Sequence, residues 1–163
     1  MLNKFAFDKY DIALITDEKE RLYYLGFHST AGYAVVTKTS VSFVVDNRYF
    51  KAAEKNLSKK GVKVISGADY SALTKIAEES GAKTLGIDFT KVTIAEYENL
   101  KKLGYDYADI SSELTAMAAI KSDEELKYIK KACDIAEKSW LNVLPFIKEG
   151  ITEKQLAAEL EYN

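Results

Sequence analysis

Short apolar segments alternate with segments of helical spacing over about the first two thirds of the chain, and this alternation limits the fold most. The apolar segments are rich in β-branched residues and are expected to form buried strands. These strands are expected at Asp11–Thr16, Ala31–Thr37, Ser40–Asp46, Val62–Ile65, Thr84–Asp88 and Asp106–Ile110. Strands that alternate with helices of about ten residues favour an α/β fold with partly parallel strands.

One pair of strands interrupts this alternation. Only Lys38 and Thr39 separate Ala31–Thr37 from Ser40–Asp46, and two residues are enough for the turn of an antiparallel hairpin. A hairpin among otherwise parallel strands makes the sheet mixed. The fold class predicted from the sequence is therefore α/β, with a mixed β-sheet flanked by helices and followed by C-terminal helices.

Capping residues and glycines mark the ends of the expected helices. Asp17 and Glu20 have the spacing of a capping box, and Thr93 and Glu96 repeat it. The four helices are expected to begin near Asp17, Asn47, Tyr70 and Thr93, and to end near Gly26, Gly61, Gly81 and Leu103.

The pattern changes after Ser112. A third capping box, Ser122-Asp-Glu-Glu125, precedes apolar residues that recur every three or four positions from Leu126 to Ile147. Pro145 should kink or end this long amphipathic helix. A last helix is capped by Thr152-Glu-Lys-Gln155 and reaches the end of the sequence without a stop signal. We therefore expect that the sequence is truncated inside a helix.

Composition excludes several classes of function. The 163 residues carry 23 basic and 25 acidic side chains, which gives no electrostatic case for binding nucleic acid or an anionic membrane. No segment approaches the roughly 20 apolar residues of a membrane span, and the N-terminus lacks the apolar core of a secretory signal. A lone cysteine, Cys133, suits a reducing cytoplasm. It lies on the apolar stripe of its helix, where we expect it to be buried.

The sequence also lacks the residues of common catalytic centres. It contains no Gly-x-Ser-x-Gly, no P-loop and no Gly-x-Gly-x-x-Gly. His28 is the only histidine, and one histidine cannot build a dinuclear metal site without many carboxylates beside it. We therefore predict no catalytic residue and no metal site within these residues.

Six short motifs occur in an order that resembles the Xaa-Pro aminopeptidases, prolidases and creatinases. They are Arg21-Leu-Tyr-Tyr-Leu-Gly-Phe27, His28-Ser-Thr-Ala-Gly32, Val45-Asp-Asn-Arg-Tyr49, Leu85-Gly-Ile-Asp88, Ile120-Lys-Ser-Asp-Glu-Glu125 and Gly150-Ile-Thr-Glu153. Two positions depart from the family pattern. Ala118 and Ala119 stand where an Arg usually precedes "I-K-S", and Leu25 runs directly into Gly26 without the usual Thr.

The resemblance implies a protein of two parts. Residues 1–116 would be a creatinase/prolidase-type N-terminal domain with a ribonuclease H-like sheet. Residues 117–163 would be the opening helices of a "pita-bread" catalytic domain. The complete enzyme would hold a pair of Mn²⁺, Co²⁺ or Zn²⁺ ions through two Asp, one His and two Glu, and would cleave short proline-containing peptides. It would be a cytoplasmic homodimer.

Four residues are candidates for substrate binding or a subunit interface: Phe27, His28, Arg48 and Tyr49. In the family, the loop after "G-F" can reach a neighbouring subunit's active site, where His28 could act as a hydrogen-bond donor or weak base. The alternative is a loop histidine without a role. Arg48 and Tyr49 could form a contact between domains or subunits. Alternatively, Asp46 caps the helix while Arg48 and Tyr49 anchor it to the sheet.

Asp88, at the end of a strand, is expected to be a turn or capping residue rather than a catalytic acid. The favoured function is a non-catalytic domain that supports a dimer and walls off one side of an active site. Two alternatives stay open, namely an inactive pita-bread relative that binds peptides or proteins, and a creatinase-like amidinohydrolase that needs no metal.

Overall fold

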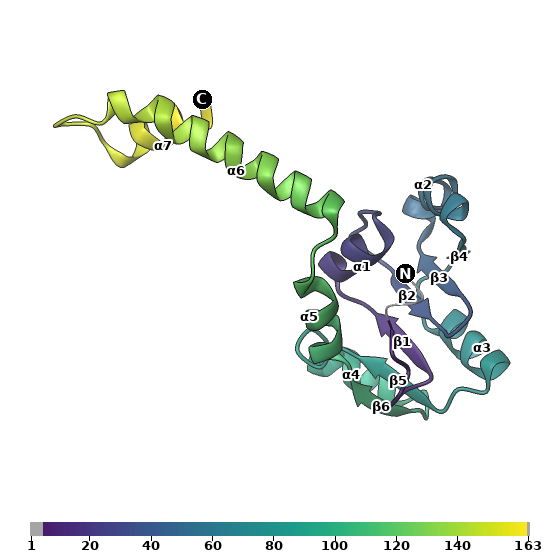
Figure 1. The fold of residues 1–163 in the computed structure, drawn as a ribbon. Coiled ribbons are helices and arrows are strands. Elements are labelled where there is room, and N and C mark those ends of the chain that lie inside the picture. The colour runs from purple at the N-terminus through teal and green to yellow at the C-terminus, as the bar shows by residue number, and fades with distance from the viewer. Residues whose placement is uncertain (1–4, 163) are drawn as a thin grey trace. The chain divides into compact units, whose positions relative to one another are not determined.

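The computed structural model describes residues 5–162, and the chain divides into two compact units (Figure 1). The first unit is Met1–Met117 and the second is Ala118–Asn163. The first contains a six-stranded sheet with helices, and the second contains helices only.

The sheet has the order β4-β3-β2-β1-β5-β6. Its strands are β1 (Ile12–Ile15), β2 (Tyr33–Val36), β3 (Val41–Val45), β4 (Val62–Ser66), β5 (Thr84–Ile87) and β6 (Asp106–Asp109). β2 is antiparallel to both β1 and β3, whereas the other pairs are parallel. The predicted hairpin and the mixed sheet are therefore confirmed.

Helices cover both faces of this sheet. The first five are α1 (Glu18–Leu25), α2 (Asn47–Leu57), α3 (Ser71–Ser80), α4 (Ile94–Lys101) and α5 (Ser111–Ala119). Residues of α1, α2 and α5 share one apolar cluster with alternate strand residues, and those of α3 and α4 share the other. In β1, Ala13 and Ile15 face the first cluster, while Ile12 and Leu14 face the second. Burial on both faces explains why the central strands β1 and β2 are continuously apolar.

Most helix ends follow the capping signals in the sequence. Both sides of the Thr93/Glu96 box are formed, as are those of the Ser122/Glu125 box. Asp17 also caps its helix, because it accepts from the backbone N–H groups of Lys19 and Glu20 at 3.0 Å. Glu20 does not complete a box, however, since its carboxyl group is hydrogen-bonded to Asp88 instead.

Helix α5 was not predicted. It is short and buries only one residue fully, Leu114, so it has no apolar stripe that a periodicity argument could detect. A local signal was present all the same. Asp109 accepts from the backbone N–H and the hydroxyl of Ser111, both at 2.9 Å, and so holds the start of the helix.

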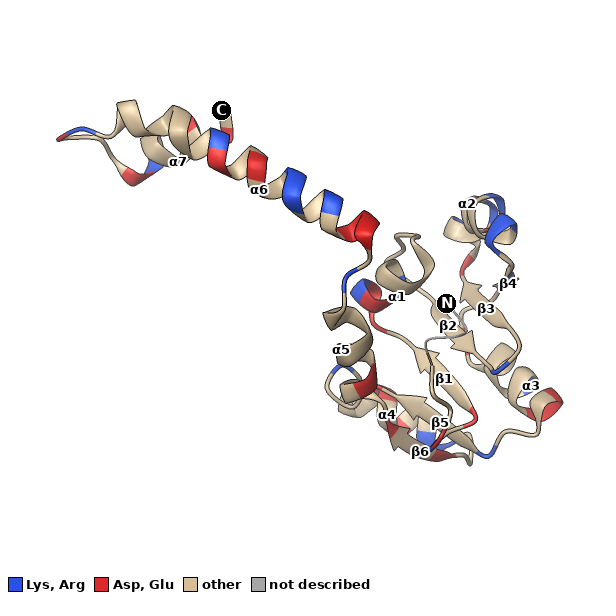
Figure 2. Cartoon of the chain, in the orientation of Figure 1, with Lys and Arg blue, Asp and Glu red and all other residues tan. Residues whose placement is uncertain are grey.

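The second unit consists of α6 (Asp123–Val143), a short 3₁₀ helix η3 (Leu144–Phe146) and α7 (Glu153–Tyr162). Pro145 lies in η3, so the predicted interruption at this proline is confirmed. Acidic and basic residues both occur along α6 (Figure 2). Its apolar stripe is exposed, with Leu126 at 51% and Trp140 at 47%. The burial predicted for Cys133 is wrong here, because this side chain is exposed as well.

Among residues 5–162, no helix is long and apolar enough to cross a membrane.

Gly32 allows the loop before β2 to pass close to β3. Its φ is +105°, a conformation that side-chain-bearing residues rarely adopt. A Cβ atom at this position would lie 2.4 Å from the backbone oxygen of Val44 and 3.2 Å from the ring of Phe43. The backbone of the loop and that of the sheet are therefore in near contact.

We expect Gly32→Ala to lower the free energy of unfolding by about 3 kcal/mol, through backbone strain and the clash with Val44. Gly61→Ala is the matched control. Gly61 also has a positive φ, +76°, but a Cβ there would meet nothing within 4 Å. The control should lose only about 1 kcal/mol. Equal losses in urea denaturation would contradict the close approach at Gly32.

Candidate functional site

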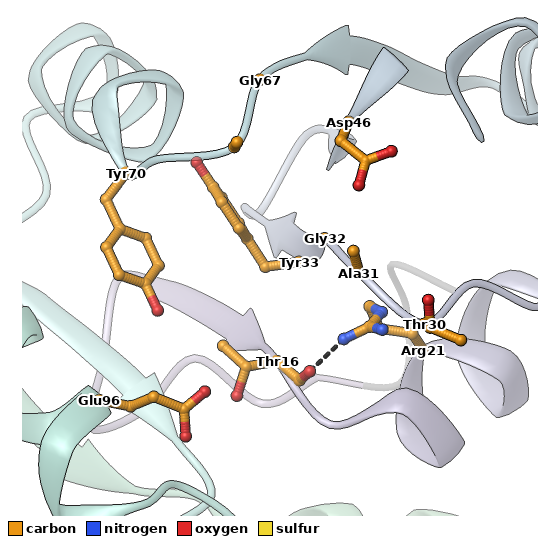
Figure 3. A pocket seen from close by; sticks show the side chains of 11 residues that line it. Thr16, Arg21, Thr30, Ala31, Gly32, Tyr33, Asp46, Gly67, Tyr70 and Glu96 are labelled. Carbon is orange, nitrogen blue, oxygen red and sulfur yellow. Dashed lines mark hydrogen bonds between the residues drawn. The ribbon is translucent and has the colours of Figure 1, made fainter. Parts of the chain in front are cut away.

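A cavity of about 320 Å³ lies at the edge of the sheet where the parallel strands end (Figure 3). Ligands of open α/β sheets commonly bind at this edge. Residues from β1, β2, β3, β4, α1 and α4 or the loops beside them line it: Thr16, Arg21, Thr30, Ala31, Gly32, Tyr33, Asp46, Gly67, Ala68, Tyr70 and Glu96.

Arg21 forms one wall of the cavity and is only 3% exposed. Its Nη1 donates to the backbone oxygen of Thr16, and its Nη2 donates to that of Ser29 at 2.8 Å. The guanidinium therefore joins the end of β1 to the loop before β2. Burial lowers the pKa of Arg21, while Glu18 and Asp17 act in the opposite direction.

Two polar atoms near this wall remain unsatisfied. Nε of Arg21 and Oγ of Ser29 are buried and have no hydrogen-bond partner within residues 5–162. A buried polar atom without a partner costs about 1–3 kcal/mol. Unsatisfied atoms of this kind are uncommon and call for an explanation, structural or functional.

Two tyrosine rings form a second wall. The ring centroids of Tyr33 and Tyr70 are 5.2 Å apart, with an angle of 44° between the rings. Tyr33 donates its hydroxyl to the backbone oxygen of Asp69 at 2.7 Å, and burial raises its pKa to about 12. The hydroxyl of Tyr70 points toward the side where Glu96 lies (Figure 3). Burial, and then the charge of Glu96, raise the pKa of Tyr70.

Asp46 also lines the cavity. It caps α2 as well, because it accepts from the backbone N–H of Arg48 at 2.9 Å. The Arg48 guanidinium lies 2.6 Å from the Asp46 carboxylate and holds the pKa of that group below its usual value. The capping role considered for Asp46 is therefore confirmed. The anchoring role considered for Arg48 is wrong, because its side chain is 69% exposed.

Tyr49 does contact the body of the domain. Its ring is partly buried against the cluster on the α2 side of the sheet. Its hydroxyl lies 3.0 Å from Oγ1 of Thr30, within hydrogen-bond distance. Tyr49 thus connects the start of α2 to the loop that lines the cavity, as expected of an anchoring residue.

Phe27 and His28 differ in their surroundings although they are neighbours. The Phe27 ring packs edge-on against Phe43, with centroids 6.0 Å apart. His28 is exposed, and its Nε2 lies 2.9 Å from the carboxylate of Glu18. None of the four candidate residues Phe27, His28, Arg48 and Tyr49 lines the cavity. Their roles in substrate binding or a subunit interface stay predictions.

A pair of carboxyl groups occupies another part of the same edge. Glu20 is hydrogen-bonded to Asp88, and burial raises the pKa of Glu20 to about 8, with Asp88 adding to the rise. Asp88 itself accepts from the backbone N–H and the hydroxyl of Thr90 at 2.7 and 2.6 Å. Its expected role as a turn residue is therefore confirmed. The sequence did not reveal the pairing because Glu20 has the spacing of a capping residue.

Within residues 5–162, no three His, Cys, Asp or Glu side chains form a group that could hold a metal ion. Thr16, Arg21, Tyr70 and Glu96 were not identified as site residues from the sequence, because they come from four separate segments. Arg21 did belong to a motif of the family resemblance, but its position in that motif does not reveal that the side chain is buried.

The comparisons with known proteins agree with this architecture. The family model of the creatinase/prolidase N-terminal domain matches residues 2–120. The chain is 30% identical over 156 residues to "Uncharacterized peptidase YqhT" of Bacillus subtilis, which covers 93% of this chain and 44% of that protein. It is also 30% identical over 156 residues to the Xaa-Pro dipeptidase of Pyrococcus horikoshii, with coverage of 92% and 42%.

Among solved structures, the Xaa-Pro dipeptidase from Bacillus anthracis matches with a TM-score of 0.89 at 28% identity, over 99% of this chain and 47% of that one. The chain therefore belongs to the creatinase/prolidase N-terminal domain family, and its relatives are Xaa-Pro peptidases. It spans less than half the length of the relatives it matches here.

The Glu20–Asp88 pair predicts a pH dependence of stability. Between the usual Glu pKa of 4.5 and the raised value of about 8, the folded state keeps a proton that the unfolded state releases. Stability should therefore fall as pH rises through this range. Glu20→Gln removes this dependence and should gain about 1–2 kcal/mol over wild type from pH 5 to pH 8, after allowance for partial exposure.

The measurement is urea denaturation of both proteins over this pH range. Glu79→Gln, which removes an exposed carboxylate from α3, is the control and should follow the wild-type curve. A Glu20→Gln curve parallel to wild type would show that the carboxyl pair does not share a proton.

Proposed function

We propose that this chain is the N-terminal, non-catalytic domain of a proline-specific metallopeptidase, an Xaa-Pro aminopeptidase or dipeptidase. The match of the family model over residues 2–120 carries the proposal. Relatives named as Xaa-Pro dipeptidases support it, because they align with more than nine tenths of the chain. In this proposal, residues 117–163 are the opening helices of the catalytic domain.

The proposed role is to support a homodimer and to limit access to the active site. Two exposed groups at the sheet edge suit contacts with another domain or subunit. His28 presents its imidazole from the loop after α1, and Arg48 presents its guanidinium at the start of α2. The carboxylate of Glu18 holds His28, and that of Asp46 holds Arg48. Both side chains are therefore partly ordered before any partner binds.

The metal chemistry would belong to the remainder of the enzyme. A pair of Mn²⁺, Co²⁺ or Zn²⁺ ions would activate a water molecule there and polarise the peptide carbonyl before proline. Residues 5–162 would form part of the wall of the active site and make binding contacts, but they would supply no metal ligands. Short proline-containing peptides would be the substrates, and the cytoplasm the location.

The test is to isolate the native protein from its source cells, measure its intact mass and assay peptide cleavage. We expect a mass roughly twice the 18.3 kDa of this chain and cleavage of Xaa-Pro peptides that a chelator abolishes and Mn²⁺ restores. Peptides with alanine in place of proline are the control. A mass equal to that of the chain without cleavage would instead indicate a binding module. Chelator-resistant hydrolysis of creatine would indicate an amidinohydrolase.

The exposed stripe of α6 predicts that the 163-residue chain associates through this helix. Leu126, Ile129 and Trp140 are each 45–51% exposed, and clustered apolar side chains tend to be covered by another surface. The double variant Leu126→Gln, Ile129→Gln should therefore shift association to higher protein concentration by about tenfold or more.

Light scattering over a range of concentrations measures this shift. The matched control is Lys127→Gln, Lys130→Gln, which changes two exposed charged residues on the same turns of α6. Its association should stay close to that of wild type. A wild-type chain that is monomeric at every concentration would overturn the prediction.

A further inference from the structure

The cavity at the sheet edge contains a buried positive charge that forms no ion pair among the described residues, although the charges of Glu18 and Asp17 favour it. Arg21 is only 3% exposed, and its two described hydrogen bonds go to uncharged backbone oxygens. No Asp or Glu within residues 5–162 forms an ion pair with it. A buried guanidinium is costly unless an anion or enough hydrogen bonds compensate it. Two of its five N–H donors are accounted for by these bonds, so it retains capacity to bind an anion.

A carboxylate without a cationic partner lies elsewhere on the lining. Glu96 accepts from the backbone N–H and the hydroxyl of Thr93 at 2.9 and 2.8 Å, both through Oε2. Within the described residues, no Lys or Arg pairs with it. Figure 3 shows the Glu96 and Arg21 side chains on different sides of the cavity, separated by Thr16. Asp46 differs from Glu96, because Arg48 already neutralises it.

The remaining wall is aromatic. Tyr33 and Tyr70 lie against each other and offer ring surface to a ligand with an apolar side chain. The volume of about 320 Å³ is near the lower end of small-molecule pockets, so the occupant is small. The cavity thus combines a positive side, a negative side and an apolar wall within a space of amino-acid size.

We propose that this cavity binds a free α-amino acid as its zwitterion. The α-carboxylate lies toward Arg21, the α-ammonium group lies toward Glu96, and the side chain packs on Tyr33 and Tyr70. Charge-assisted hydrogen bonds at both ends give the affinity. Because the unpaired charges have opposite signs, a simple anion or a simple amine satisfies only one side. This site is independent of the proposed peptidase function, since it needs neither a metal nor a catalytic domain.

The test uses L-leucine, N-acetyl-L-leucine and L-leucinamide as probes. The second probe lacks the ammonium group and the third lacks the carboxylate. Each is titrated into the full 163-residue chain, and binding is followed by the amide NMR shifts of Thr30–Tyr33 and Gly67. We expect L-leucine to shift these signals, and both derivatives to bind about tenfold or more weakly.

Glu96→Gln separates the ionic role of this residue from its capping role. A Gln at the same position of a capping box still accepts from the backbone, as Gln155 does from Thr152. The variant should therefore fold, bind L-leucine about tenfold more weakly and bind N-acetyl-L-leucine no more weakly than wild type. Glu98→Gln is the matched control. Glu98 lies on the same helix but pairs with Lys101 in solvent, so L-leucine binding should be unchanged.

Three results would each overturn the proposal. The first is an absence of shifts at the cavity with saturating L-leucine. The second is equal affinity for all three probes, which would show that charge is not recognised. The third is unchanged L-leucine binding in Glu96→Gln. Arg21→Lys is a secondary variant, because loss of the bonds to Thr16 and Ser29 can disturb the fold. Failure of this proposal leaves the peptidase assay of the native protein unaffected.

Discussion

The guanidinium of Arg21 fixes the connection that leads into β2, the antiparallel strand of this sheet. By donating to Thr16 and Ser29, it connects the end of β1 to the loop that leads into β2. That loop must then turn back sharply, and Gly32 allows it to pass within contact distance of β3. The reversal places β2 between two parallel strands and leaves the cavity at the sheet edge. The cost of burying the charge is therefore met partly by backbone oxygens.

Acidic residues gather at the same edge, yet most of them have structural roles. Asp17 and Asp46 follow β1 and β3, Asp109 ends β6, and all three accept from the first N–H groups of the next helix. Asp88 follows β5 and accepts from Thr90 in a turn. Carboxylates at such positions accept hydrogen bonds from the free N–H groups of a helix N-terminus and interact favourably with the positive end of the helix dipole. Their clustering reflects repeated β-to-α connections and does not by itself indicate acid–base catalysis.

The two units differ in how completely they bury their apolar residues. The first unit encloses its strands between two helical layers, and its core residues are almost fully buried. The second leaves most of the α6 stripe exposed, and Val143 is its only fully buried described residue. This difference supports the proposal that the second unit begins a larger domain. It also explains why Cys133 is exposed despite its place on an apolar stripe.

The sequence by itself determined the local structure and the family. Apolar runs, caps and the two-residue turn identified the strands, the hairpin and most helix ends, because these depend on neighbouring residues. The ordered motifs identified the relationship to the Xaa-Pro peptidases.

Only the tertiary structure decided the partners of Arg21 and Glu20. Residues of separate segments meet at the sheet edge, and burial then determines whether a charge is paired, shared or left without a partner. The capping-box spacing of Glu20 could not show its bond to Asp88, since the two lie 68 positions apart (88 − 20 = 68). The cavity was equally hidden, because its walls come from different strands and helices that only the fold brings together.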